Sequence, residues 1–324
     1  MAEVTMGQAI NQALRHSLEE DDRVLVFGED IGKLGGVFRI TDKLQEEFGD
    51  ERVFDTPLAE SGIMGISIGL ALAGWKPVPE MQFDAFSYPA LDQVISHLAK
   101  YRFRTKATAS MPVVMRIPFG GAVGAAEHHS ESPEVYYAHT AGLKVVVPST
   151  PLDAFNLLVR SIRDPDPVVF LEPKSRYWSK ESGEFDAGGL PIGASRVVRE
   201  GEHATLISWG GMVHRCLEAA AAAEEDGVGV EVLDLRSLVP LDVEGVVAAA
   251  RKTGRVVVVH EAPLTAGFGA EIVARVVEEA FDHLEAPVLR VAGHDMPYPP
   301  ATVEEHYLPT VERILQALSR TLTY

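Results

Sequence analysis

The chain has 324 residues, a formal net charge of -18 at pH 7 and a single cysteine, Cys216. This length exceeds the usual size of one domain and predicts two domains, each large enough to bury a core. The acidic balance argues against nucleic acid as a partner, because a phosphate backbone favours a basic face. One cysteine excludes an internal disulfide framework and a cysteine-only zinc site.

The first 24 residues lack the basic flank and apolar stretch of a signal peptide, and their pattern predicts an amphipathic helix instead. We therefore expect a cytoplasmic protein. The most apolar run, residues 63–75, is shorter than the about 20 apolar residues that a membrane-spanning helix needs. No membrane segment is expected.

Short β-branched runs alternate with helical patterns through residues 1–175, which predicts an α/β domain around a largely parallel sheet. Its expected strands are residues 24–27, 113–117, 143–147 and 168–171. Residues 176–200 are polar and contain glycine and proline, which is typical of a linker. Residues 201–324 predict a smaller α/β domain, with strands at 204–208, 230–233 and 256–260 and helices at 216–225 and 270–281.

Glu60 is the only charged residue between Pro57 and Lys76, in a helix apolar enough to be buried on most sides. Two interpretations are open. In one, Asp55, Thr56 and Glu60 cap and charge the first helical turn. In the other, Glu60 is a buried acid whose desolvation tunes its pKa for proton transfer. Glycines along the same helix (Gly62, Gly65, Gly69 and Gly74) predict a close contact with another helix, with another subunit as a candidate partner.

The segment GGAVGAAEHHSESPE places His128 and His129 after a glycine-rich stretch. Metal binding is disfavoured, because adjacent residues do not share one helical face as zinc ligands usually do. A catalytic imidazole on a loop and a surface or hydrogen-bonding role both remain open. In MQFDAFSYPALDQV, the aromatic residues either pack in the core or form a stacking platform.

The segment FGEDIGKLGGVFRI does not predict a phosphate-binding loop. It lacks GxGxxG and GxxxxGK[ST], and the carboxylates of Glu29 and Asp30 would repel a phosphate. Its glycines predict a bend that brings the backbone close to another element.

Six segments together resemble the β subunit of the E1 component of 2-oxo acid dehydrogenases nearly end to end: FGEDIGKLGGVFR, FDTPLAESGIMGISIGLALAG, ALDQVISHLAKYRFRT, HHSESPEVYYAH, IRDPDPVVFLEPK and EAPLTAGFGAEI. Such subunits are thiamine diphosphate enzymes of transketolase type. The resemblance implies a pyrimidine-binding α/β domain followed by a smaller transketolase C-terminal-like α/β domain.

The resemblance also implies site residues. Glu60 matches the glutamate that hydrogen-bonds N1' of the cofactor's aminopyrimidine, in a general acid/base role. His129 matches the active-site histidine, which orients or protonates the intermediate formed after attack on the keto carbon, whereas His128 inherits no role. The other expected cofactor-binding residues are Leu58, Gln82, Phe86 and Glu29, and no residue is assigned to a metal.

The chain lacks the GDG motif and downstream Asn pair with which thiamine enzymes hold the diphosphate through Mg²⁺. The resemblance therefore implies an E1 α subunit that supplies this half of the site, in an α2β2 heterotetramer with sites at the α/β interfaces. The helix that begins at Glu60 is a candidate contact. Some relatives bind a structural potassium ion near residues 161–166, through backbone ligands that a sequence does not reveal.

The implied reaction is oxidative decarboxylation of a 2-oxo acid with acyl transfer to the lipoyl group of the E2 lipoyl acyltransferase. HHSESPE, FLEPK, AKYRFRT and EAPLTAGFGAEI favour branched-chain acids, with pyruvate as the alternative. The absent diphosphate motif and the short length disfavour a single-chain transketolase or deoxyxylulose phosphate synthase. A non-catalytic assembly subunit is disfavoured because Glu60 and His129 both stand in their motifs.

Overall fold

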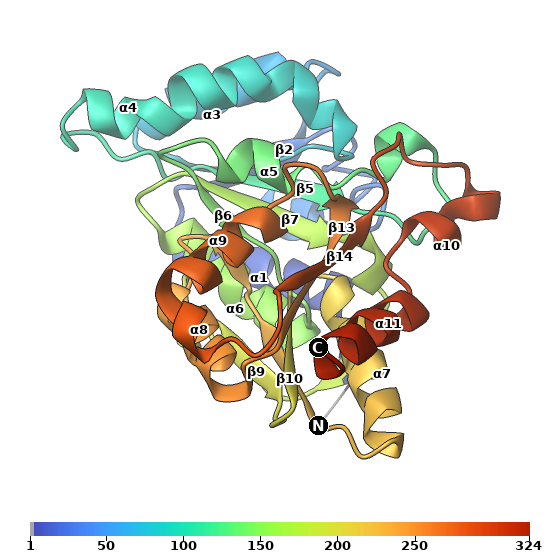
Figure 1. Ribbon diagram of the computed structural model, residues 1–324. Coiled ribbons are helices and arrows are strands. Elements are labelled where there is room, and N and C mark those ends of the chain that lie inside the picture. The colour runs from blue at the N-terminus through green and yellow to red at the C-terminus, as the bar shows by residue number, and fades with distance from the viewer. Residues whose placement is uncertain (1–2) are drawn as a thin grey trace.

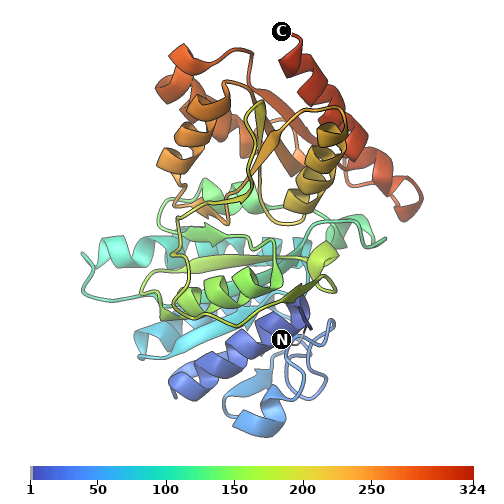
Figure 2. The same ribbon diagram turned by 90° about the horizontal axis from the view of Figure 1, so that it is seen from below.

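The computed structural model describes residues 3–324, which form two large sheets with helices on both faces of each, and one small two-stranded sheet (Figure 1). We call residues 3–182 the N-terminal unit and residues 196–324 the C-terminal unit. In Figure 2 the N-terminal unit, blue to green, lies below the C-terminal unit, yellow to red. No helix within residues 3–324 is long and apolar enough to cross a membrane.

The first sheet has seven strands in the order β12-β6-β7-β5-β4-β2-β3, and all pairs except β12–β6 are parallel. The prediction of a largely parallel sheet is confirmed, and the four expected strands lie at β2, β5, β6 and β7. Strand β12 comes from the C-terminal unit and adds an antiparallel edge. The bounds are β2 Val24–Gly28, β3 Val53–Asp55, β4 Lys76–Glu80, β5 Val114–Phe119, β6 Lys144–Val146, β7 Val168–Pro173 and β12 Ser237–Val239.

Successive residues of each strand face opposite sides of this sheet. Val24 and Val26 pack into the core under the first pair of helices, α1 Met6–Glu20 and α6 Pro151–Arg163. Leu25 and Phe27 pack on the other side, beneath α3 Glu60–Leu72. The expected amphipathic N-terminal helix is α1, which starts with a capping box between Thr5 and Gln8. Short helices complete the unit: α2 Leu44–Phe48, η1 Ala85–Ala90, η2 Gln93–Leu98, α4 Ala99–Arg104, η3 Glu127–His129 and α5 Glu134–Ala138.

The second sheet has the order β14-β13-β10-β11-β9, with β9 antiparallel at one edge. Helices α7 and α11 cover one face, and α8 and α9 cover the other (Figure 1). The expected strands and helices of this unit are confirmed. The bounds are β9 Arg196–Arg199, β10 Ala204–Ser208, α7 Met212–Glu225, β11 Val230–Asp234, α8 Val243–Thr253, β13 Val256–Pro263, α9 Gly269–Ala280, η5 Phe281–His283, β14 Leu289–Gly293, η6 Ala301–Val303, α10 Glu304–Tyr307 and α11 Val311–Leu322.

The two units share a core. One apolar cluster contains side chains of β5, β7 and α5 from the N-terminal unit and of β10, α8 and α9 from the C-terminal unit. The segment between the sheets contains η4 Lys174–Arg176 and β8 Lys180–Ser182, and β8 pairs with the N-terminal strand β1 Glu3–Thr5. Within the segment predicted as a linker, β8 thus pairs with the N-terminal unit, whereas β9 pairs with β11 of the C-terminal unit. The domain bounds at 175 and 200 stay a prediction.

Candidate active site

The expected site residues gather at one edge of the first sheet. Strands β3, β2, β4 and β5 are parallel neighbours, and Gly28 is in register with Asp55 on one side and Glu80 on the other. Their carboxyl ends therefore meet at one edge, which is where open parallel sheets bind ligands. Expected residues follow each strand there: Leu58 and Glu60 after β3, Glu29 after β2, Gln82 and Phe86 after β4, and His128 and His129 after β5.

Glu60 is the first residue of α3, and no side chain caps this helix. Asp55 instead accepts a hydrogen bond from the Gly32 backbone N–H at 2.6 Å, and Thr56 Oγ1 is buried without a partner. The capping interpretation is therefore wrong for Asp55 and Thr56, although Glu60 does lie in the first turn. Within FGEDIGKLGGVFRI, a Cβ at Gly28 would approach Glu80 O to 2.7 Å, so the predicted close backbone approach is confirmed.

The Glu60 side chain is buried without a cation. The residue is 9% exposed, and no basic group within residues 3–324 forms an ion pair with it. Partial burial raises the pKa of the neighbouring Glu29, with further contributions from the negative charges of Glu60 and Asp30. Gln82 Nε2 donates to Asp30 Oδ2 at 3.1 Å, so Gln82 lies next to the residue that follows Glu29. Two carboxyl groups without a cation are stabilised by a ligand that can share a proton with one of them.

Helix α3 is buried on one face only. Ile63, Met64 and Ile68 pack on the sheet, whereas Ile66 on the outer face is 58% exposed and Leu58, just before the helix, is 75% exposed. The helix lies along the outer surface at the top of Figure 1. The expectation of burial on most sides is wrong for this chain alone, because the chain supplies a cover for one face and leaves an apolar face open.

The aromatic residues form a wall around His129. The ring centroid of His129 lies 3.9 Å from that of Phe83 and 5.2 Å from that of Phe86. Partial burial lowers the pKa of His129, and the positive charges of His128 and Lys174 lower it further. Its Nδ1 is buried and has no hydrogen-bond partner among residues 3–324, so this nitrogen is available to a ligand. His128 is exposed and stacks on Phe86 at 6.1 Å.

A buried ion pair that the sequence did not predict supports this wall. Lys174 Nζ lies 2.8 Å from Asp84 Oδ1, and neither side chain is exposed. Lys174 Nζ also lies 6.0 Å from the centroid of the Phe83 ring, and Asp84 Oδ2 accepts from the Glu131 backbone N–H at 2.8 Å. The available signal was that Lys174, in FLEPK, directly follows another strand of the same parallel sheet.

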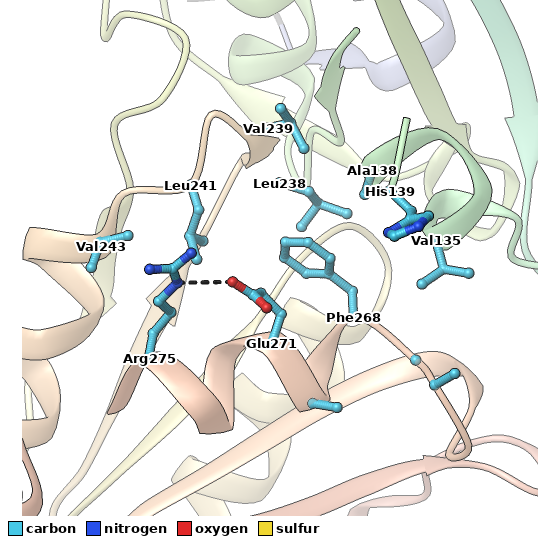
Figure 3. Close-up of a pocket in the computed structure, with 13 residues that line it drawn as sticks. Val135, Ala138, His139, Leu238, Val239, Leu241, Val243, Phe268, Glu271 and Arg275 are labelled. Atoms are coloured by element: carbon cyan, nitrogen blue, oxygen red, sulfur yellow. Dashed lines mark hydrogen bonds and ion pairs between the residues drawn. The ribbon is translucent and has the colours of Figure 1, made fainter. Parts of the chain in front are cut away.

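A separate pocket of about 470 Å³ lies between the two units and contains none of the expected site residues (Figure 3). Its walls come from α5, from the segment around β12 and from the start of α9. Phe268 points toward Leu238, and Glu271 and Arg275 form a hydrogen-bonded pair at 2.8 Å along α9. Because its charged groups already pair with each other, the pocket offers less chemistry than the sheet edge.

The described residues contain no group of three or more histidine, cysteine or acidic side chains placed to hold a metal ion. In the loop at residues 161–166, Lys144 Nζ lies 2.7 Å from Asp164 and 3.1 Å from Asp166. Arg102 Nη1 also lies 2.6 Å from Asp166. Basic side chains of this chain therefore already pair with both carboxylates of that loop.

Comparisons with known proteins agree with this geometry. Residues 2–179 match the transketolase pyrimidine binding domain, and residues 193–314 match the transketolase C-terminal domain. A solved structure described as a split gene transketolase, inactive beta4 tetramer, superposes with a TM-score of 0.82 at 23% identity, covering 99% of this chain and 98% of the other. The predicted fold class is confirmed.

Two curated relatives are similar over almost their whole length. Identity is 54% over 321 residues to the pyruvate dehydrogenase E1 component subunit beta of Leifsonia xyli subsp. xyli, covering 98% of this chain and 95% of the relative. It is also 54% over 320 residues to the 3-methyl-2-oxobutanoate dehydrogenase subunit beta of Mycobacterium tuberculosis, covering 98% and 92%. The chain therefore belongs to the family of β subunits of the E1 component of 2-oxo acid dehydrogenases.

Proposed function

We propose that the chain is the β subunit of a thiamine diphosphate-dependent E1 that decarboxylates branched-chain 2-oxo acids and transfers the acyl group to the lipoyl group of E2. The observation that carries the proposal is the Glu60 carboxylate at the sheet edge that also holds Phe86 and His129; it is 9% exposed and has no cationic partner within residues 3–324. Such a carboxyl group calls for a partner that shares its proton.

The residues at this edge fit the aminopyrimidine half of the cofactor. Glu60 would hold or share a proton with a ring nitrogen, and Phe86 would pack on the ring. Leu58, Gln82 and Glu29 would border it. When bound, the cofactor supplies a carbon nucleophile for the 2-oxo group. His129, kept neutral by partial burial and neighbouring positive charges, would hold or deliver a proton at the substrate oxygen.

The open face of α3 supports an E1 α subunit as the partner, in an α2β2 heterotetramer. A Cβ built at Gly69 would meet nothing within 4 Å, so no contact within this chain requires glycine there. Glycine costs about 1 kcal/mol relative to alanine inside a helix, and a closely packed partner helix would offset that cost. The missing diphosphate motif supports an α chain that also holds the diphosphate and Mg²⁺.

Gly69→Leu tests this contact. We expect the isolated chain to remain folded with equal or slightly higher stability, while assembly with α is lost, because a leucine would occupy the space of the partner helix. Size-exclusion chromatography of the co-expressed chains measures assembly. Ala221→Leu, at an exposed position of α7, is the matched control and should assemble normally. Normal assembly of Gly69→Leu would mean that the α subunit does not pack against α3 at Gly69.

The choice of substrate is tested with the assembled enzyme. The relatives named for pyruvate and for 3-methyl-2-oxobutanoate are equally identical, at 54%, so the branched-chain proposal rests on the sequence segments that resemble that group. Decarboxylation of 3-methyl-2-oxobutanoate and of pyruvate should be compared with thiamine diphosphate and Mg²⁺ present, followed by acyl transfer to a lipoylated E2 domain. Preference for pyruvate would leave the proposed mechanism unaffected but show that the substrate is pyruvate and not a branched-chain acid. No turnover of either acid would favour a non-catalytic assembly subunit.

A further inference from the structure

The loop at residues 120–131 carries both histidines and is closed at its base. The Gly120 backbone N–H donates to Glu131 O at 2.8 Å, so the two ends of the loop lie side by side. The Glu131 N–H donates to Asp84, whose other oxygen binds Lys174. One end of the loop is thus attached to the N-terminal unit through a buried ion pair.

The other end is attached to the C-terminal unit through backbone amides. Ala122 N–H donates to Glu304 Oε1 at 2.8 Å, Gly124 N–H donates to Glu304 Oε2 at 3.3 Å, and Gly121 N–H donates to Glu261 Oε1. Ala122 and Gly124 have left-handed φ values of 61° and 69°. Alternation of left-handed residues with ordinary ones turns successive N–H groups to one side and forms a concave anion site.

The contact between loop and C-terminal unit is tight and specific. A Cβ at Gly121 would overlap the hydroxyl of Tyr298, and this hydroxyl donates to Glu304 Oε1 at 2.6 Å. Glu261 and Glu304 are both buried, and no basic side chain within residues 3–324 forms an ion pair with either. Because a buried carboxylate without a paired cation is costly, the hydrogen bonds from the loop amides and from the Tyr298 hydroxyl stabilise these two carboxylates.

We infer that Glu261, Glu304 and Tyr298 are positioning residues for His129, so that the C-terminal unit sets the geometry of a histidine in the N-terminal unit. The inference rests on the proposed function of His129. These three side chains hold residues 121–124, and the bond between Gly120 and Glu131 carries that restraint to the segment containing His129. Misplacement of a reacting group by about 1 Å can lower a rate about 100-fold.

Hydrogen exchange tests the contact without any need for catalysis. In the assembled α2β2 complex, Glu304→Gln should increase the exchange rate of the Ala122 and Gly124 amides about tenfold or more, because the charged acceptor is lost. Glu305→Gln, at an exposed position beside it, is the matched control and should change nothing. Unchanged exchange in Glu304→Gln would overturn the inference. Should that variant fail to assemble, Tyr298→Phe removes one donor to Glu304, keeps the ring, and should raise exchange at the same amides.

Kinetics of the assembled enzyme test the route through His129. Glu304→Gln should lower kcat about 10- to 100-fold and leave KM unchanged. In a His129→Ala background the same change should have little further effect, because both act on one group. Losses that multiply would overturn positioning through His129. Wild-type turnover of His129→Ala alone would refute its proposed role, while faster amide exchange in Glu304→Gln would still identify the contact between the units.

Discussion

Two sets of buried charged groups in the N-terminal unit differ in how they are neutralised. In the first set, around Arg116, the guanidinium binds Glu172 at 2.7 Å and Glu80 at 2.9 Å. Tyr177 completes this set by donating to Glu172 at 2.6 Å. Each of these acids has a cation, and the set ties β4, β5 and β7 together inside the sheet.

The second set consists of Glu60, Glu29 and His129 at the carboxyl edge of the same sheet, and no basic side chain within residues 3–324 forms an ion pair with either acid. The charge of Glu60 contributes to the raised pKa of Glu29, after partial burial, and His129 Nδ1 has no hydrogen-bond partner among the described residues. Glu80 and Glu29 are near neighbours, since Glu80 is in register with Gly28. The difference shows that the fold neutralises the acids that hold strands together and leaves open those that face the proposed cofactor.

Glu60→Gln should have the largest effect. Glutamine keeps the shape of the side chain but does not accept or release the proton, so we expect kcat of the assembled enzyme to fall by about 10²- to 10⁴-fold. Thiamine diphosphate should still bind, which calorimetric titration of the complex measures, and the free energy of unfolding should not fall. Asp22→Asn, at a fully exposed acid, is the control. Retained turnover in Glu60→Gln would exclude the proposed role of this residue.

Arg116→Met should have the next largest effect, on stability. Removing the cation leaves Glu80 and Glu172 buried without it, which typically costs about 3–5 kcal/mol. Burial raises the pKa of Glu80 to about 7, although Arg116 opposes this rise. Without Arg116 the pKa rises further. At pH 5 Glu80 is protonated with or without Arg116, whereas at pH 8 the variant has to bury a charged Glu80 without its cation or bind a proton. The loss of stability should therefore be smaller at pH 5 than at pH 8.

Urea unfolding of Arg116→Met and of the exposed control Arg320→Met, at pH 5 and pH 8, measures this difference. An Arg116→Met variant as stable as the control at both pH values would mean that the first set does not hold the sheet together. Neutralisation of Glu80 and Glu172 by Arg116 would then not distinguish the first set from the second.

Local patterns predicted most of the fold. The apolar run VVFL at residues 168–171 coincides with the first part of β7, because a buried parallel strand needs consecutive apolar side chains. Strand β12 escaped prediction, since three residues carry too little periodicity and their partner β6 lies about 90 positions earlier. The glycines of α3 predicted a contact with another helix, but the exposure of Ile66 and Leu58 was not predicted, because an apolar helix has the same sequence pattern whether its own chain covers one face or all of them.

The residues of the candidate site came from motifs, and their roles stay a prediction. Motifs pointed to Glu60, Phe86 and His129, and the parallel strands bring them to one edge. Lys174 and Glu304 were missed because a charged residue at the start of a short helix has the same local sequence pattern whether it is exposed or buried. Their partners, Asp84 and Ala122, lie 90 and 182 positions away, so no local pattern connects them.

His260 is a buried titratable residue away from the sheet-edge site, and it tests whether burial without a charged partner occurs outside that site. Its ring stacks on Trp209 at 5.5 Å, and a Cβ at Gly267 would lie 2.6 Å from it. Burial lowers the pKa of His260 from 6.5 to about 4, with a smaller contribution from Arg290. A lowered pKa means that the neutral form stabilises the fold above pH 6.5 and that this stability is lost as the pH falls toward 4.

Between pH 7 and pH 5 this effect amounts to about 2 kcal/mol of unfolding free energy. His260→Leu should therefore show a correspondingly smaller loss over that range in urea unfolding, and any packing cost of the leucine cancels because only the pH-dependent part is compared. Equal pH dependence in both proteins would mean that His260 is protonated without penalty. A smaller loss in the variant, with turnover of the assembled enzyme unchanged at pH 7, would show that burial lowers the pKa of His260 without any part in catalysis. The proposed role of the acids at the sheet edge would then rest on their position beside His129 and Phe86 and not on burial alone.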